Sequence, residues 1–119
     1  MLRRVVGAAG FELSLGLTPV APLSRLQEVV QRNRVRLRRE LQRLGASNIR
    51  LFGSVVRGED GPESDIDLLV DVDESTGLFV LGRMRSVAES ILGVAVDVVP
   101  ETSLKPDVRD RVLAEAIPL

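Results

Sequence analysis

Two acidic residues, Asp65 and Asp67, flank a single isoleucine ahead of an apolar run. Residues two apart in a β-strand point to the same face, roughly 7 Å from each other, so both carboxylates can reach one cation. Acidic pairs of this kind also occur at the start of strands without any catalytic or binding role. Here Asp97 accompanies it, and an isolated acid in the apolar segment 94–99 is costly without a metal or a hydrogen-bond donor as partner. If the two strands pair in register, three carboxylates meet.

Three carboxylates in one place repel one another unless a cation lies among them. The chain has no His, and the segments around Asp65, Asp67 and Asp97 offer no Lys. Mg²⁺ suits hard oxygen ligands and normally completes its shell with waters and with a substrate's phosphates. Two such ions about 4 Å apart can activate an attacking oxygen and stabilise a leaving one. We therefore predict a magnesium site formed by these three acids, with two ions expected.

Gly53 and Ser54 precede the acidic pair, at the end of an expected strand. A glycine there lets phosphate oxygens approach the backbone, and Ser54 offers a hydroxyl and an N–H. Arg57 lies in the following loop, where its guanidinium can hold a phosphate with two hydrogen bonds. An exposed loop arginine often does nothing specific, so both interpretations of Arg57 stay open. The run from Gly53 to Asp67 predicts a site for a metal-bound nucleoside triphosphate.

The composition excludes several other kinds of active site. The 119 residues contain no Cys and no His, which removes disulfides, Cys/His zinc sites, and catalytic pairs of Ser or Cys with His. They contain no Trp or Tyr, which disfavours a sugar-stacking cleft for glycoside hydrolysis and a base-stacking platform for nucleic acid. No Walker-type phosphate loop occurs. Only carboxylates, hydroxyls, Lys and Arg remain for chemistry.

The apolar periodicity predicts six elements that would position these residues. A helix is expected from the N-cap Ser24 to Leu44, ahead of Gly45. Strands are expected over 48–52, 65–73 and 94–99, a second helix over 78–92, and a final helix beginning at Pro106 and Asp107. This order predicts an α+β fold of two layers, with a small mixed sheet flanked by helices.

The length predicts one domain, which we place at residues 23–119. Residues 1–22 show no sustained periodicity and are interrupted by Gly and Pro, which predicts a poorly structured extension. No segment approaches the roughly 18 apolar residues of a membrane span, so a cytoplasmic protein without membrane contact is expected. The expected helix over 24–44 is rich in Arg. A solvated or partner-facing surface explains those arginines more simply than nucleic-acid binding does.

Gly53-Ser54, ten residues, and then Asp65-Ile66-Asp67 resembles the signature of the polymerase-beta-like nucleotidyltransferase superfamily. Arg57-Gly58, and Ser64 before the acids, resemble its minimal, MNT-type branch. The resemblance covers about residues 48–100, extends to the preceding helix and the final four residues, and leaves 1–22 without a counterpart. It implies the polymerase-beta-like fold and a shared set of roles: Asp65 and Asp67 as metal ligands, Asp97 as the third carboxylate, and Gly53, Ser54, Arg57 and Ser64 around the nucleotide.

Small members of this branch are antitoxins that transfer AMP from ATP to a tyrosine of an HEPN-type ribonuclease toxin and also bind that toxin. The resemblance thus implies a Mg²⁺-dependent enzyme that places AMP on a hydroxyl of a partner protein and releases pyrophosphate. This chain has no Tyr, so it could not modify itself on that residue type. Two alternatives stay open: a binding module that neutralises its partner by docking alone, and nucleotidyl transfer to a small molecule or RNA end with a second subunit. The apolar face of the helix over 78–92 also suits pairing with another copy or with a partner.

Overall fold

The computed structural model describes residues 22–119. Four α-helices, four strands and a short 3-10 helix follow one another along this part of the chain. Their bounds are α1 Arg25–Arg43, β1 Ser47–Phe52, α2 Ser54–Arg57, β2 Ile66–Asp71, α3 Leu78–Leu92, β3 Val96–Pro100, η2 Glu101–Ser103, α4 Pro106–Glu115 and β4 Ile117–Pro118. The extension expected over residues 1–22 lies outside the described residues, apart from Pro22.

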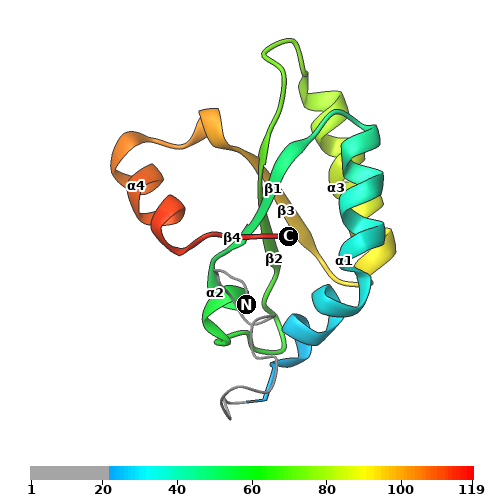
Figure 1. The fold of residues 1–119 in the computed structure, drawn as a ribbon, viewed down its shortest axis with the longest axis vertical. Coiled ribbons are helices and arrows are strands. Elements are labelled where there is room, and N and C mark those ends of the chain that lie inside the picture. Colours follow the sequence, from blue (N-terminus) through cyan, green and yellow to red (C-terminus); the bar gives the residue numbers. More distant parts are fainter. Residues whose placement is uncertain (1–21) are drawn as a thin grey trace, which may run out of the picture.

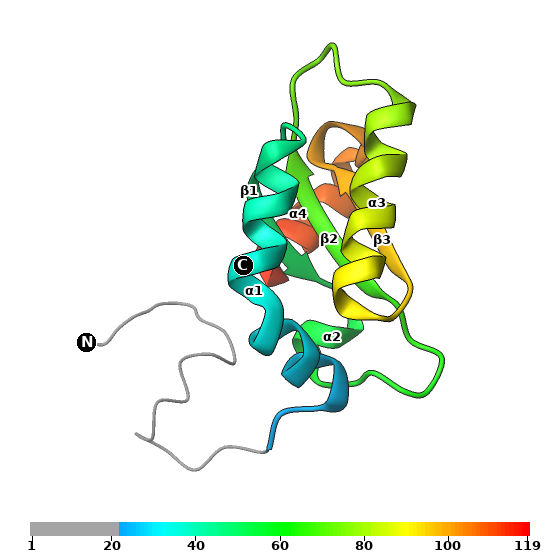
Figure 2. The same ribbon diagram turned by 90° about the vertical axis from the view of Figure 1, so that its right-hand side faces the viewer.

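The four strands form one sheet in the order β3-β2-β1-β4. β1 runs antiparallel to both β2 and β4, whereas β2 and β3 are parallel, so the sheet is mixed as predicted. Helices α1 and α3 lie side by side over one face, and α4 lies on the opposite side of the sheet (Figure 1). The view in Figure 2 looks onto α1 and α3, with the sheet and then α4 behind them.

Helix α1 begins where the sequence predicts. The Ser24 hydroxyl accepts a hydrogen bond from the N–H of Gln27 at 3.1 Å, and the Gln27 side chain accepts one from the N–H of Ser24 at 2.9 Å. This reciprocal cap satisfies two N–H groups that a helix start would otherwise leave unpaired. The apolar stripe of the helix, which includes Leu26, Val30 and Leu37, is buried against the sheet and α3.

Strand β2 has apolar residues on both of its faces. Ile66, Leu68 and Val70 are fully buried in the main core beneath α1 and α3, as their alternation predicts. Leu69 is also fully buried but does not belong to that core, because it points to the opposite face. Val112 of α4 is buried on that opposite side. Apolar side chains are therefore also buried on the α4 side of the sheet (Figure 1).

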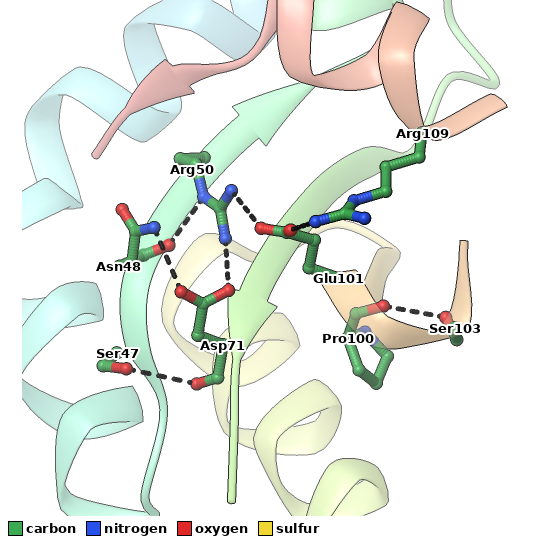
Figure 3. Close-up of polar contacts among 8 residues, drawn as sticks. All are labelled: Ser47, Asn48, Arg50, Asp71, Pro100, Glu101, Ser103 and Arg109. Atoms are coloured by element: carbon green, nitrogen blue, oxygen red, sulfur yellow. Dashed lines mark hydrogen bonds and ion pairs between the residues drawn. The ribbon is translucent and has the colours of Figure 1, made fainter. Parts of the chain in front are cut away.

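A buried arginine joins the sheet to the elements on the α4 side (Figure 3). Arg50 of β1 is only 8% exposed, and a charge at that depth needs partners. Its guanidinium pairs with Asp71 of β2 at 2.7 Å and with Glu101 of η2 at 2.9 Å, and Arg109 of α4 pairs with the same Glu101 at 2.8 Å. Hydrogen bonds from Arg50 and then from Arg109 hold the pKa of the Glu101 carboxyl below its ordinary value. These four residues are called the Arg50 network below.

Sequence periodicity did not predict α2, η2 or β4, since each is too short to show a period. The strand expected over 65–73 is also too long. It ends at Asp71 because Asp73 begins a turn, in which its carbonyl accepts the N–H of Thr76 and its carboxylate accepts that of Ser75. The strand expected from residue 94 begins at Val96. Among residues 22–119, no helix has both the length and the apolar character to cross a membrane.

Candidate active site

The strand order brings the chemically active residues to one end of the sheet. β1 ends at Phe52 and leads directly into Gly53 and Ser54. Because β2 is antiparallel to β1, its beginning lies at the same end, where Asp67 pairs with Phe52. β3 is parallel to β2, and its Asp97 pairs with Asp67. From one side to the other, the site therefore presents the Gly53-Ser54 turn, then Asp67, then Asp97.

Asp67 and Asp97 occupy equivalent positions on adjacent parallel strands, so their side chains leave the same face of the sheet. Asp67 is half-buried, and Asp97 is exposed at the edge strand. Asp65 is exposed and lies one residue before β2 begins, outside the ladder that was expected to include it.

The electrostatic environment of Asp67 opposes its negative charge. Burial is the main cause, and the charges of Asp97, Asp65 and Glu115 add to it in that order, while Arg57 acts in the opposite direction. Together they raise the pKa of the Asp67 carboxyl to about 6. A perturbed acid among other acids is typical of a functional site, because the repulsion would be relieved by a cation.

The donors at this end of the sheet fit a hard divalent cation such as Mg²⁺. They are carboxylate oxygens. The negative charge of Asp67, which lies between the Gly53-Ser54 turn and Asp97, is opposed by burial and by its acidic neighbours. Within residues 22–119, no three acidic side chains are grouped closely enough to form a metal site by themselves. Protein sites for Mg²⁺ commonly supply only one or two carboxylates and take the remaining ligands from water and from substrate phosphates. The residues present therefore fit a site that the substrate completes.

Gly53 has a backbone that only glycine adopts readily, with φ +82° and ψ −156°. A side chain here would also collide with its neighbour, since a Cβ built on Gly53 overlaps the carboxylate of Asp67. The turn therefore passes directly against the central acid of the site. Ser54 follows as the first residue of α2, so its hydroxyl and N–H stand at the same turn.

Glu115, the last residue of α4, was not predicted as a site residue from the sequence. One oxygen of its carboxylate accepts a hydrogen bond from the N–H of Gly53 at 2.8 Å, and the other accepts one from Arg57 at 2.6 Å. Arg57 also donates to Glu59 at 2.8 Å. The hydrogen bonds that Arg57 donates to Glu59 and Glu115 raise the pKa of its guanidinium above its already high value. No local pattern marks Glu115, because it lies 62 residues from Gly53 in the chain.

Ser64 lies before the acidic pair and closes a turn of the connecting loop. Its hydroxyl accepts a hydrogen bond from the N–H of Gly61 at 2.8 Å, and its own N–H donates to the carbonyl of Gly61 at 3.1 Å. In this arrangement Ser64 shapes the loop between α2 and β2.

Gln27 of α1 holds the short helix α2, which follows Gly53, in place. In addition to capping α1, it donates a buried hydrogen bond of 2.8 Å from Nε2 to the carbonyl of Val55 in α2. The side chain is only 7% exposed, so neither contact is replaced easily by water. α1 thereby fixes the position of the short helix that carries Ser54 and Arg57.

A groove of about 420 Å³ opens beside Asp97, on the side of the site away from Gly53. It runs between the first half of α3 and the end of β3. Its lining includes Leu81 and Gly82 of α3 and Val98 and Pro100 of β3, together with Asp97 itself. Leu78, which also lines the groove, and Phe79 at the start of α3 are 86% and 80% exposed.

Comparisons with known proteins agree with this geometry. The family model described as a nucleotidyltransferase domain matches residues 34–119. A protein adenylyltransferase MntA from Thermococcus cleftensis is 35% identical over 95 residues, which are 80% of this chain and 93% of that protein. A provisionally named protein adenylyltransferase from Methanocaldococcus jannaschii is 40% identical over 73 residues, which are 61% of this chain and 78% of that protein.

Solved structures show the same fold. One that is provisionally described as a minimal nucleotidyltransferase has a TM-score of 0.71 and 43% identity, covering 77% of this chain and 94% of its own. A toxin-antitoxin structure with AMP-PNP has a TM-score of 0.62 and 23% identity, covering 74% of this chain and 70% of its own. A MntA-HepT toxin-antitoxin structure has a TM-score of 0.56 and 21% identity, covering 77% of this chain and 70% of its own. The last two establish likeness of fold alone.

Proposed function

Because this chain belongs to the nucleotidyltransferase domain family, we propose that it is an antitoxin that transfers AMP from ATP to a tyrosine hydroxyl of an HEPN-type toxin. The named activity of the Thermococcus cleftensis relative supports protein adenylylation, and the toxin-antitoxin complexes that share the fold support the partner. A toxin-antitoxin structure with AMP-PNP supports an adenine nucleotide as donor. The acceptor lies on another protein because this chain has no Tyr.

One observation carries the proposal: Asp67 faces Asp97 across two parallel strands, directly beside the Gly53-Ser54 turn. Asp65, Asp67 and Asp97 would hold Mg²⁺, and when bound the ion would neutralise charge that develops on the phosphates. Gly53, Ser54 and Arg57 would hold the triphosphate with N–H, hydroxyl and guanidinium donors, and Ser64 would shape the loop that encloses it. Catalysis in this scheme consists mostly of positioning and charge neutralisation.

In the proposed reaction, the acceptor oxygen attacks the α-phosphorus of ATP in line with the departing pyrophosphate. One P–O bond forms to the tyrosine oxygen, and the bond between the α- and β-phosphates breaks. Asp97 accepts the hydroxyl proton, since it is the exposed acid at the edge of the site. Donor and acceptor then approach from opposite sides of Asp67: the triphosphate from the Gly53 side, and the acceptor over β3, through the groove beside Asp97.

The test is label transfer to the partner. The purified chain is mixed with ATP labelled on its α-phosphate, Mg²⁺ and an HEPN-type toxin encoded beside it, and the labelled protein is identified by mass spectrometry. We expect one or more labelled tyrosines on the toxin with the wild type, and no label with Asp67→Asn or Asp97→Asn. Asp73→Asn is the matched control, because Asp73 lies in the exposed turn after β2. Equal labelling by wild type and Asp67→Asn would reject the proposal.

Neutralisation by docking alone makes a different prediction in cells. If docking is sufficient, Asp67→Ala protects cells from the toxin as well as the wild type does. If AMP transfer is required, Asp67→Ala binds the toxin in a pull-down but does not protect. Measuring growth and binding with the same variants separates the two functions.

A further inference from the structure

We infer that Glu115 is a self-inhibitory carboxylate, which occupies the phosphate-binding groups of the nucleotide site and must leave them before a triphosphate binds. This inference rests on the proposed function, because it concerns regulation of the same site. It depends on two contacts of one carboxylate: one oxygen lies 2.8 Å from the backbone nitrogen of Gly53, and the other lies 2.6 Å from the Arg57 guanidinium.

The two partners of Glu115 are the donors that a phosphate would use. Gly53 presents its N–H at a turn where it has no side chain of its own to stand in the way, and Arg57 presents a guanidinium suited to paired anionic oxygens. A carboxylate with one oxygen on each donor resembles two oxygens of a phosphate group in charge and in spacing. A triphosphate bound to the same donors would displace Glu115, because two anions cannot share them without strong repulsion.

The acidic surroundings strengthen the conflict. Glu115 is one of the charges that oppose ionisation of Asp67, so its carboxylate adds to the negative potential into which a triphosphate must move. Removing Glu115 from the turn therefore vacates two donors and reduces the repulsion at Asp67 at the same time.

The rest of the fold allows the carboxylate to leave. β4 follows Glu115 and is anchored independently, by pairing with β1 and by hydrogen bonds that join Leu119 to Ile49 and to Arg38. α4 is tied to η2 through Arg109 of the Arg50 network, and it buries Val112. A rotation of the Glu115 side chain is thus sufficient, and no strand has to unpair. The hydrogen bonds of Glu115 stabilise the nucleotide-free protein, and the need to break them lowers the affinity of the site for nucleotide.

The test measures two properties of one set of variants. Binding of Mg²⁺-AMP-PNP is measured by calorimetry, and thermal unfolding is measured without nucleotide. We expect Glu115→Ala and Glu115→Gln to bind the nucleotide at least threefold more tightly than wild type, although both unfold at a lower temperature. A residue with a merely structural role would weaken both properties, so lower stability together with weaker or unchanged binding overturns the inference.

Two controls make the result specific. Asp110→Asn removes one negative charge from the exposed surface of α4, and Glu59→Gln removes the other partner of Arg57 without affecting Gly53. Each should change affinity less than Glu115→Ala does. An equal gain from either control would overturn the inference, because charge alone would then explain it. If wild type and every variant fail to bind the nucleotide, the proposed function fails instead.

Discussion

Gly53 and Asp67 approach each other so closely that the position of a Cβ on Gly53 is already filled by the Asp67 carboxylate. The two residues come from the end of one strand and the start of the next, and the antiparallel pairing of β1 with β2 sets them together. Glycine is needed here for two reasons. It adopts backbone angles that other residues rarely adopt, and its lack of a side chain leaves room for the Asp67 carboxylate.

Gly53→Ala is expected to destabilise the fold and to abolish AMP transfer. The backbone strain alone costs about 1–3 kcal/mol, and the added methyl group must push the Asp67 carboxylate out of place. Urea unfolding and label transfer measure the two effects. Gly82→Ala is the control, because Gly82 lies in α3 with no atom near its Cβ position, and the helix should gain about 0.5–1 kcal/mol. A Gly53→Ala protein with wild-type activity would show that the close approach is not needed.

Asp67→Asn should make the metal-free protein more stable at neutral pH while it removes activity. The folded-state pKa of about 6 lies above the ordinary pKa of an aspartate, 3.8. The folded state therefore binds more protons than the unfolded state between these values, and wild-type stability falls as the pH rises through this window. After allowance for solvent screening of a half-buried group, we expect Asn to contribute on the order of 1 kcal/mol at pH 8. Urea unfolding in EDTA at pH 4 and pH 8 measures it, and a gain that is equal at both pH values would contradict this assignment.

Arg50→Met should destabilise the fold by about 2 kcal/mol, because it leaves Asp71 and Glu101 without their shared buried cation. The full penalty of a buried ion is not expected, since Glu101 keeps Arg109 and Asp71 keeps a hydrogen bond from Asn48. Chemical denaturation measures the loss. Arg109→Met breaks only the exposed arm of the network and should cost less than about 1 kcal/mol. Equal losses for the two variants would show that burial of Arg50 has no special weight.

Gln27→Leu tests whether α1 positions the phosphate-binding turn. The substitution keeps the volume of the side chain but leaves the N–H of Ser24 without its partner, and the carbonyl of Val55 keeps only the N–H of Gly58 at 3.3 Å. We expect a cost of about 1–3 kcal/mol. Nucleotide binding should weaken several-fold under conditions in which the protein is still folded. Gln42→Leu on the exposed side of the same helix should change neither property. If folded Gln27→Leu binds nucleotide as tightly as wild type, then α1 does not position the turn.

Gly82→Gln should block the acceptor and spare the nucleotide. The side chain would project from α3 into the groove beside Asp97, where open space surrounds the Gly82 position. AMP-PNP affinity should remain near wild type and the melting temperature should not fall, because Gln favours a helix more than Gly does. The rate of label transfer to the toxin should fall at least tenfold. Ser90→Gln, an exposed position farther along α3 and outside the groove lining, is the matched control. A normal transfer rate in Gly82→Gln would place the acceptor route elsewhere.

The long periodic elements and the central acids could be predicted from sequence, because their signals are local. The α1 stripe, the alternation of Ile66, Leu68 and Val70, and the position of Asp97 in an apolar strand follow from side-chain spacing alone. The mixed sheet was confirmed, as was the burial of the even-numbered side of β2. The condition that the two acid-bearing strands pair in register is met at Asp67 and Asp97, but their parallel direction was not predicted. The catalytic roles of Asp65, Asp67 and Asp97 remain a prediction.

The remaining features depend on contacts between distant residues, which spacing does not encode. Glu115 contacts Gly53 across most of the domain, and Arg50 contacts Glu101 across 51 residues. α2 has four residues and β4 has two, so neither carries a period. The strand limits at Asp71 and Val96 were set by neighbouring turns rather than by a change of residue type.

The attachment of α4 has a consequence for how the molecule responds to heat and salt. This helix has few contacts with the rest of the fold, and charged pairs supply much of its anchorage, whereas α1 is secured by a deep apolar stripe. Ion pairs weaken as ionic strength rises, and weakly attached segments open first in local fluctuations. Amide protons of α4 should therefore exchange with solvent sooner than those of α1, and sooner still in concentrated salt. Since Glu115 belongs to this weakly attached helix, such fluctuations would break its contacts with Gly53 and Arg57 before the domain as a whole unfolds.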